Sequence, residues 1–187
     1  MVKISRLIRN SVAGAAGIFS GLIFLSKLKG QPEPQPIPAF FTRKPHYIFA
    51  HRGGMALRPE QTKLAFDTAA SYEVDGFETD VRVTSDEQLI VFHDATVDRT
   101  TNGSGKVREH RLDELQKLDA GYHFKDINKE TPYRDHPDAK ILTFDQLLEL
   151  YPDMLINVDL KDSPDSYEGT IAPELLYKSI VRHNAQD

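Results

Sequence analysis

The alternation of apolar and polar positions predicts an α/β domain that begins near residue 45. Four short apolar runs have the length and composition of β-strands: residues 46–51, 76–83, 88–94 and 154–161. Four further segments carry apolar residues at helical spacing: residues 59–74, 112–118, 143–150 and 172–184. Pro59 suits the first turn of a helix, and Thr143 is a predicted N-cap. Strands that alternate with helices predict a mainly parallel sheet covered by helices.

One predicted strand, GFETDVRV at residues 76–83, carries acidic side chains within its polar face. Because strand side chains alternate, Glu78, Asp80 and Arg82 share one side and the apolar residues share the other. A polar outer face is common on strands, so this spacing alone is weak evidence for a site. In a parallel sheet, however, buried carboxylates are costly unless they are paired or bind a metal. The pair is therefore a candidate cation site.

Ionisable residues stand near one end of every predicted strand. They are His51 and Arg52, Glu78 and Asp80, His93 and Asp94, and Asp159 and Lys161. Functional groups of parallel α/β sheets gather at the carboxyl ends of the strands, so we expect these side chains to lie close together.

These residue types predict the cleavage of a phosphodiester. The carboxylates of Glu78, Asp80 and Asp159 are hard oxygen ligands suited to Ca²⁺ or Mg²⁺. His51 and His93 could share the general-acid and general-base roles, because imidazole titrates near neutral pH.

Two cations and one further carboxylate complete the predicted site. The planar guanidinium of Arg52 and the ammonium of Lys161 are suited to phosphate oxygens. Asp94 either orients His93 or begins a turn, and the sequence leaves both interpretations open.

The charge distribution separates the first 45 residues from the rest. Residues 1–45 contain seven Lys or Arg and one Glu, whereas the remainder contains 16 basic and 27 acidic side chains. An acidic body repels phosphate polymers, so we expect no nucleic-acid partner, and a nuclease is the weaker alternative. Because the chain has no cysteine, any metal must be held by oxygen or nitrogen.

The first 44 residues have the pattern of a membrane anchor followed by a spacer. A basic segment at residues 1–10 precedes an uncharged stretch at 11–26, near the short end of what spans a bilayer. Without a clear cleavage site, this pattern favours a retained signal-anchor helix over a removed signal peptide or a buried soluble helix. Alternating prolines predict that residues 27–44 are a semi-rigid linker rather than a ligand for a proline-binding module. We expect residues 45–187 to be membrane-anchored and extracytoplasmic.

The order of the motifs resembles that of the glycerophosphodiester phosphodiesterases. The segments AHRGG, FETDV and VFHD are similar to the family's His-Arg, Glu-x-Asp and His-Asp motifs. The flanking segments RPEQTKLAFDTA, DRTTNGSGKV, LQKLDAG, ILTFDQLLEL and INVDLK are also similar, so the resemblance covers about residues 46–162. Each dipeptide is unspecific alone, but the combined order is highly specific.

The resemblance implies a TIM (β/α)8 barrel that uses a divalent cation, Ca²⁺ or Mg²⁺. The implied reaction is hydrolysis of a glycerophosphodiester to an alcohol and glycerol 3-phosphate, with a cyclic phosphate if a glycerol hydroxyl attacks first. Some members of the family act instead on lysophospholipids. The implied roles are acid/base catalysis for His51 and His93, phosphate binding for Arg52 and Lys161, and metal binding for Glu78, Asp80 and Asp159.

Three departures from the family pattern are present. Gln61 replaces the usual Asn at the start of the first helix, and Asp159 replaces a Glu that is one methylene longer. The four predicted strands are half of the eight in a TIM barrel, so we expect the N-terminal half of the barrel. The alternative to a membrane-anchored enzyme is a truncated, catalytically inactive module tethered to the membrane.

Overall fold

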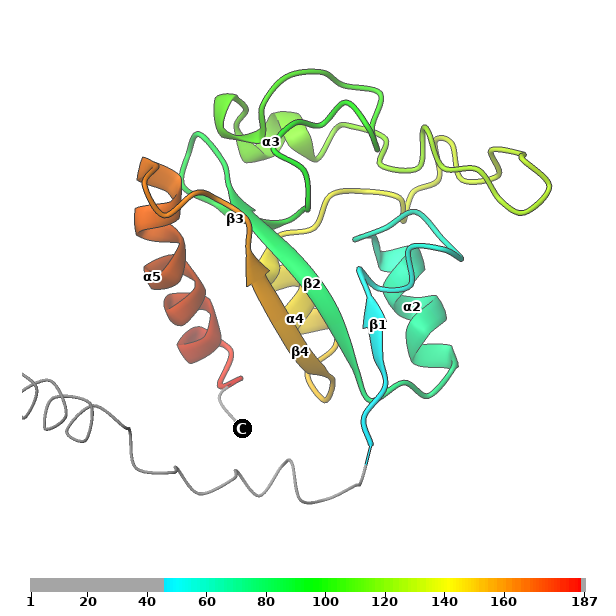
Figure 1. The fold of residues 1–187 in the computed structure, drawn as a ribbon, viewed down its shortest axis with the longest axis horizontal. Helices are drawn as coiled ribbons and strands as arrows, with labels where there is room; N and C mark the ends of the chain where they lie inside the picture. The colour runs from blue at the N-terminus through cyan, green and yellow to red at the C-terminus, as the bar shows by residue number, and fades with distance from the viewer. Residues whose placement is uncertain (1–45, 186–187) are drawn as a thin grey trace, which may run out of the picture. The chain divides into compact units, whose positions relative to one another are not determined.

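A computed structural model describes residues 46–185, which form a four-stranded sheet with helices packed against it (Figure 1). The strands are β1 (Phe49–His51), β2 (Gly76–Val83), β3 (Leu89–Val91) and β4 (Leu155–Leu160). The helices are α2 (Lys63–Ser71), α3 (Leu112–Leu115), α4 (Phe144–Leu150) and α5 (Tyr167–Arg182), with a 3-10 turn η2 (Val107–Glu109). The predicted α/β class is confirmed for this part of the chain.

The long strand β2 pairs with all three other strands. β1 and β4 run parallel to it, in register with Gly76–Glu78 and Gly76–Val81 respectively. β3 runs antiparallel to it, with Val81 opposite Val91 and Val83 opposite Leu89. The sheet is mainly parallel, as predicted, but the expectation of four parallel barrel strands was wrong. The turn after β2 is too short for a crossover helix, so β3 folds back as a hairpin.

β1 and β3 lie along the same edge of β2 and approach each other from opposite directions. β4 occupies one edge of β2 over residues 76–81, so the strands that pair at Glu78 and at Val81 must share the other edge. The chain continues past β3 with a hydrogen bond from the Phe92 N–H to the Asp80 carbonyl (2.9 Å). Thr79 therefore lies between the carboxyl ends of two converging strands.

The apolar face of the sheet packs on α2, α4 and α5. Phe77 and Val81 of β2 are buried with Phe66 of α2, Leu147 of α4 and Ala172 of α5. A second apolar cluster lies under the long loops and η2, and comprises Ile90, Phe92, Val97, Val107, Leu115, Ala120 and Ile141. The apolar side of β2 faces the helices, so Glu78, Asp80 and Arg82 project from the opposite face.

Local side-chain chemistry explains where two helices begin. Thr143 Oγ1 accepts a hydrogen bond from the Gln146 N–H, and Gln146 Oε1 accepts one from the Thr143 N–H, which confirms the predicted N-cap. The first helix begins at Lys63 rather than Pro59, because Thr62 is its N-cap. Gln61 has φ +61°, a left-handed conformation that a helix cannot contain.

The last helix begins five residues before the predicted start at residue 172. Ser166 caps it by accepting a hydrogen bond from the Gly169 N–H, and Pro173 lies inside the helix. The prediction was wrong because a proline usually occurs in the first turn of a helix.

The predicted basic segment, anchor and linker at residues 1–44 lie outside the described residues. Within residues 46–185, none of the helices combines the length and the apolar character needed to cross a bilayer.

Candidate active site

The two predicted catalytic histidines lie at the ends of the two strands that converge on one edge of β2. His51, the last residue of β1, is in register with Glu78. His93 follows Phe92, whose backbone bonds to Asp80. Both histidines therefore lie beside the carboxylate pair, as predicted. The predicted reason was wrong for His93, because its strand is antiparallel and reaches this position by folding back.

Glu78 and Asp80 are held by backbone and side-chain donors. The Arg52 N–H donates to Glu78 Oε2 at 2.9 Å, and His51 Nε2 lies 3.8 Å from the same oxygen. Asp80 is 1% exposed. Its Oδ2 accepts a hydrogen bond from Gln61 Nε2 at 2.6 Å and lies 3.5 Å from Arg52 Nε.

Lys161 joins the second and fourth strands of the site. Its Nζ lies 3.0 Å from Asp80 Oδ1 and donates to Asp159 Oδ2 at 2.6 Å. Asp159 is in register with Asp80, so both side chains project from the same face. The hydrogen bond from Lys161 to Asp159 and the nearby Asp80 carboxylate raise the pKa of Lys161.

Carboxylate oxygens are suitable ligands for a hard divalent cation, although here they contact basic and amide groups. Among residues 46–185, no three acidic or histidine side chains converge closely enough to form a metal site as they stand. Asp80 Oδ1 is nevertheless buried without a hydrogen bond, since Lys161 contacts it outside hydrogen-bond geometry. Oxygen ligands of this kind suit Ca²⁺ or Mg²⁺. Glu78, Asp80 and Asp159 are the residues that could hold the ion.

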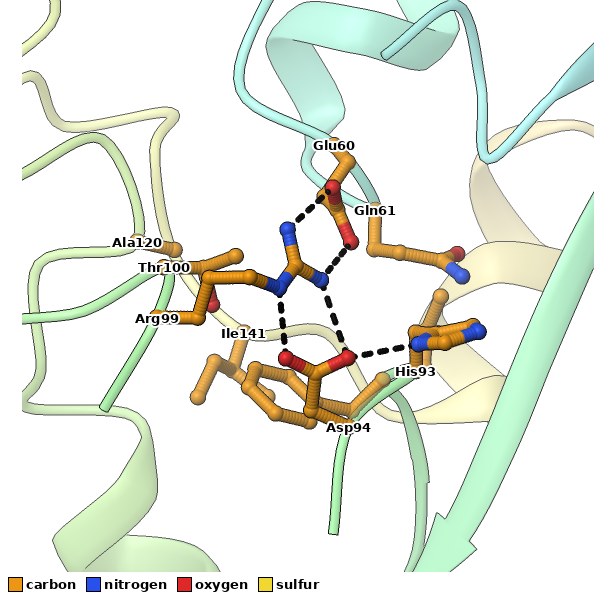
Figure 2. A pocket seen from close by; sticks show the side chains of 10 residues that line it. Glu60, Gln61, His93, Asp94, Arg99, Thr100, Ala120 and Ile141 are labelled. Atoms are coloured by element: carbon orange, nitrogen blue, oxygen red, sulfur yellow. Dashed lines mark hydrogen bonds and ion pairs between the residues drawn. The ribbon is translucent and has the colours of Figure 1, made fainter. Parts of the chain in front are cut away.

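His93 is oriented by a carboxylate that is itself clamped by an arginine (Figure 2). Asp94 Oδ1 lies 2.6 Å from His93 Nδ1, and Arg99 donates two hydrogen bonds to the Asp94 carboxylate. The hydrogen bond from Arg99 lowers the pKa of Asp94 to about 2. An ionised carboxylate only accepts hydrogen bonds, so Nδ1 must carry the proton and Nε2 is the nitrogen available for catalysis. Of the two interpretations of Asp94, orientation of His93 is confirmed.

The low pKa of Asp94 predicts a loss of stability in acid. A lowered folded-state pKa stabilises the protein above the unfolded value of about 4, and this contribution is lost as the pH falls through about 2. Arg99 is half-exposed, so solvent screening reduces the effect to about 1 kcal/mol. Urea unfolding should therefore show wild type more stable than Asp94→Asn at pH 6, with a much smaller difference near pH 2. An equal difference at both pH values would contradict this assignment.

Three residues of the site were not predicted from the sequence: Glu60, Gln61 and Arg99. The Gln61 amide accepts from Thr79 Oγ1 (2.6 Å) while donating to Asp80, which ties the loop before α2 to the converging strand ends. Glu60 accepts from Arg52 Nη1 (3.1 Å) and from Arg99. The sequence signal was the similarity of RPEQT and DRTT to family segments, which assigned no role to Glu60 or Arg99.

The contacts divide the site into two groups joined by Arg52. The first group comprises His51, Glu78, Asp80, Asp159 and Lys161, and the second comprises His93, Asp94, Arg99 and Glu60. A pocket lies on the side of the second group, where Gln61, His93, Asp94 and Arg99 line it (Figure 2).

Arg82, the third polar residue of β2, has a structural role. Its guanidinium donates to the His93 carbonyl (2.8 Å) and to Asp162 (2.8 Å). It therefore fixes the backbone of the second histidine and the start of the segment after β4.

Known proteins with similar sequences cover the same region. Residues 51–185 match the model of the glycerophosphoryl diester phosphodiesterase family. A glycerophosphodiester phosphodiesterase from Bacillus subtilis is 37% identical over 134 residues, which are 72% of this chain and 45% of the relative. One from Caldanaerobacter subterraneus is 38% identical over 142 residues, or 75% of this chain and 54% of the relative. The chain thus spans about half the length of the curated relatives it matches.

Solved structures support the same fold. A glycerophosphoryl diester phosphodiesterase domain from Mycobacterium tuberculosis matches with a TM-score of 0.66 and 29% identity, over 74% of this chain and 49% of that one. An Oleispira antarctica phosphodiesterase, solved with the product sn-glycerol-3-phosphate, matches with a TM-score of 0.63 and 29% identity, over 74% and 53% of the two chains. These matches support the TIM-barrel fold of that family for the described residues. The chain belongs to the glycerophosphoryl diester phosphodiesterase family.

Proposed function

We propose that the protein containing this chain hydrolyses glycerophosphodiesters to an alcohol and glycerol 3-phosphate. The observation that carries the proposal is the convergence of His51 and His93 on one edge of β2, beside Glu78 and Asp80. Two groups able to exchange protons and a cluster of carboxylates are the components that metal-assisted cleavage of a phosphodiester requires.

The two histidines divide the proton transfers of this reaction. One imidazole removes a proton from the attacking oxygen, which is a water or the free glycerol hydroxyl of the substrate. The other gives a proton to the alcohol oxygen as its bond to phosphorus breaks. His93 exchanges its proton at Nε2, because Nδ1 is bonded to Asp94. Attack by the glycerol hydroxyl gives a cyclic phosphate, which a second attack by water opens.

The charged residues around the histidines bind the phosphate. Arg52 and Lys161 are cations next to the carboxylates, and Arg52 Nε is buried without a hydrogen bond. A planar guanidinium with a free N–H is suited to a phosphate oxygen. A divalent cation held by Glu78, Asp80 and Asp159 would neutralise charge that develops on the phosphate.

The same proposal includes attachment of the domain to a membrane and the formation of a (β/α)8 barrel. A signal-anchor at residues 11–26 and a linker at 27–44 would hold the domain on the extracytoplasmic side of a membrane. Lysophospholipids would then be accessible as alternative substrates. The three parallel strands of the described region would form the N-terminal part of a (β/α)8 barrel, with the polar face of β2 directed to its interior.

The proposal is tested by measuring glycerol 3-phosphate released from a panel of glycerophosphodiesters and lysophospholipids. The diesters should carry different alcohols, so that the panel also identifies the preferred leaving group. We expect release of glycerol 3-phosphate from at least one diester. If no substrate of the panel is cleaved, the proposed activity is wrong, and the result favours a non-catalytic module.

A further inference from the structure

One arginine that the sequence did not predict, Arg99, links two carboxylates of the second group of active-site residues. The guanidinium of Arg99 donates to Asp94 through Nε (2.5 Å) and Nη2 (3.0 Å). It also donates to Glu60 through Nη1 (2.9 Å) and Nη2 (2.7 Å). Figure 2 shows the guanidinium lying between the two carboxylates. Only arginine has a rigid planar group with enough N–H donors to bind two carboxylates in this way.

Each carboxylate that Arg99 holds contacts a residue of the proposed site. Asp94 Oδ1 accepts from Arg99 and also lies 2.6 Å from His93 Nδ1. Glu60 Oε1 accepts from Arg99 and also from Arg52 Nη1 at 3.1 Å. The result is a continuous series of five side chains, from His93 through Asp94, Arg99 and Glu60 to Arg52, which joins the ends of β1 and β3.

Because Glu60 is buried, this series of contacts depends on Arg99. The side chain of Glu60 is 9% exposed, and a buried carboxylate is costly without cationic partners. Burial alone would raise the pKa of Glu60, but hydrogen bonds from Arg99 and Arg52 hold it below its usual value. The hydrogen bonds that Arg99 donates to Glu60 and Asp94 in turn raise the pKa of Arg99. All three groups are therefore ionised at neutral pH.

We propose that Arg99 is a positioning residue, which holds Asp94 against His93 and Glu60 against Arg52 and thereby orients both residues for phosphodiester cleavage. The importance of this orientation rests on the proposed function. Arg99 acts without touching the substrate. Displacement of a catalytic group by about 1 Å can lower the rate about a hundredfold.

The experiment compares wild type with Arg99→Met, which keeps the length of the side chain but removes every donor. With histidine labelled by ¹⁵N and its His93 signal assigned through His93→Gln, NMR in the absence of substrate should show a fixed Nδ1–H tautomer in wild type. In Arg99→Met we expect a mixture of tautomers at His93. Arg99→Lys, which keeps the charge but not the planar group, should give an intermediate spectrum.

A matched control separates positioning from general charge effects. Arg108 is 49% exposed, against 47% for Arg99, and its ion pair with Glu168 spans 4.0 Å. Arg108→Met should leave both the His93 spectrum and the turnover unchanged, whereas Arg99→Met should lower kcat about tenfold to a hundredfold with a smaller change in KM. Thermal unfolding followed by circular dichroism establishes that each variant is folded, and Arg99→Lys carries the test if Arg99→Met is not.

Failure of the positioning role can be told apart from failure of the proposed function. An unchanged His93 spectrum in a folded Arg99→Met or Arg99→Lys variant overturns the positioning role, even if the variant is less stable. A disturbed His93 spectrum in a protein that cleaves no diester supports the positioning of His93 by Arg99. It contradicts only the proposed activity.

Discussion

Removal of divalent cations is expected to abolish the release of glycerol 3-phosphate by the protein that contains this chain. Glu78, Asp80 and Asp159 gather negative charge beside the two histidines, and such charge opposes an anionic substrate unless a cation compensates it. An excess of chelator should lower turnover by at least about a hundredfold, and added Ca²⁺ or Mg²⁺ should restore it. Titration with each ion in turn would identify the one that supports activity.

Binding of the cation should also be visible without substrate. A ligand present at about one hundred times its Kd stabilises the folded state by about 2.7 kcal/mol, which raises the unfolding temperature. Asp80→Asn should remove this effect, because it replaces the buried carboxylate by a neutral amide. Asp113→Asn is the matched control, since Asp113 is 64% exposed and pairs with neighbouring Lys117 and Arg111. Chelator-insensitive turnover, with no cation-dependent shift in unfolding temperature, would contradict the metal role.

Replacement of either histidine should lower kcat by about 10² to 10⁴, with a smaller effect on KM. This range is typical of the loss of a general acid or base. His51→Ala should leave thermal stability almost unchanged, because the His51 side chain is 60% exposed. His93→Ala also removes a hydrogen bond to Asp94, so a modest loss of stability is expected in addition.

Steady-state kinetics with the preferred diester provides the measurement. His123→Ala is a suitable control, because His123 is exposed and its ring packs on Tyr122. If both active-site variants keep the wild-type kcat, the assignment of the two histidines is wrong.

The sequence predicted elements where a strong local signal was present. The alternation in GFETDVRV gave the bounds of β2 as the structure has them, and Thr143 marked the start of α4. The pairing direction of β3 could not be predicted from its composition, because a short apolar run fits a parallel or an antiparallel strand equally well. The hairpin was instead encoded in the tight turn at Thr84–Gln88, where the Thr84 N–H donates to the Gln88 carbonyl.

The predicted site residues are brought together in part by contacts that no spacing in the sequence reveals. Glu78 and Asp80 followed from strand periodicity, whereas the approach of Lys161 to Asp80 depends on the pairing of β4 with β2. Glu60 and Arg99 are 39 positions apart and meet only because two long loops fold over the strand ends. Single charged residues in loops are normally solvated, so nothing in the sequence distinguished this pair.

Because β1 and β3 converge on one edge of β2, the length of the hairpin between β2 and β3 determines whether the two histidines lie together. The turn between β2 and β3 determines which residue of the returning strand stands beside Asp80. Insertion of a single residue there would shift the register by one and exchange the faces of Ile90 and Val91, so that His93 would no longer stand where it does. A relative with a different turn length would need a compensating change in β3 to keep the two histidines at the same edge.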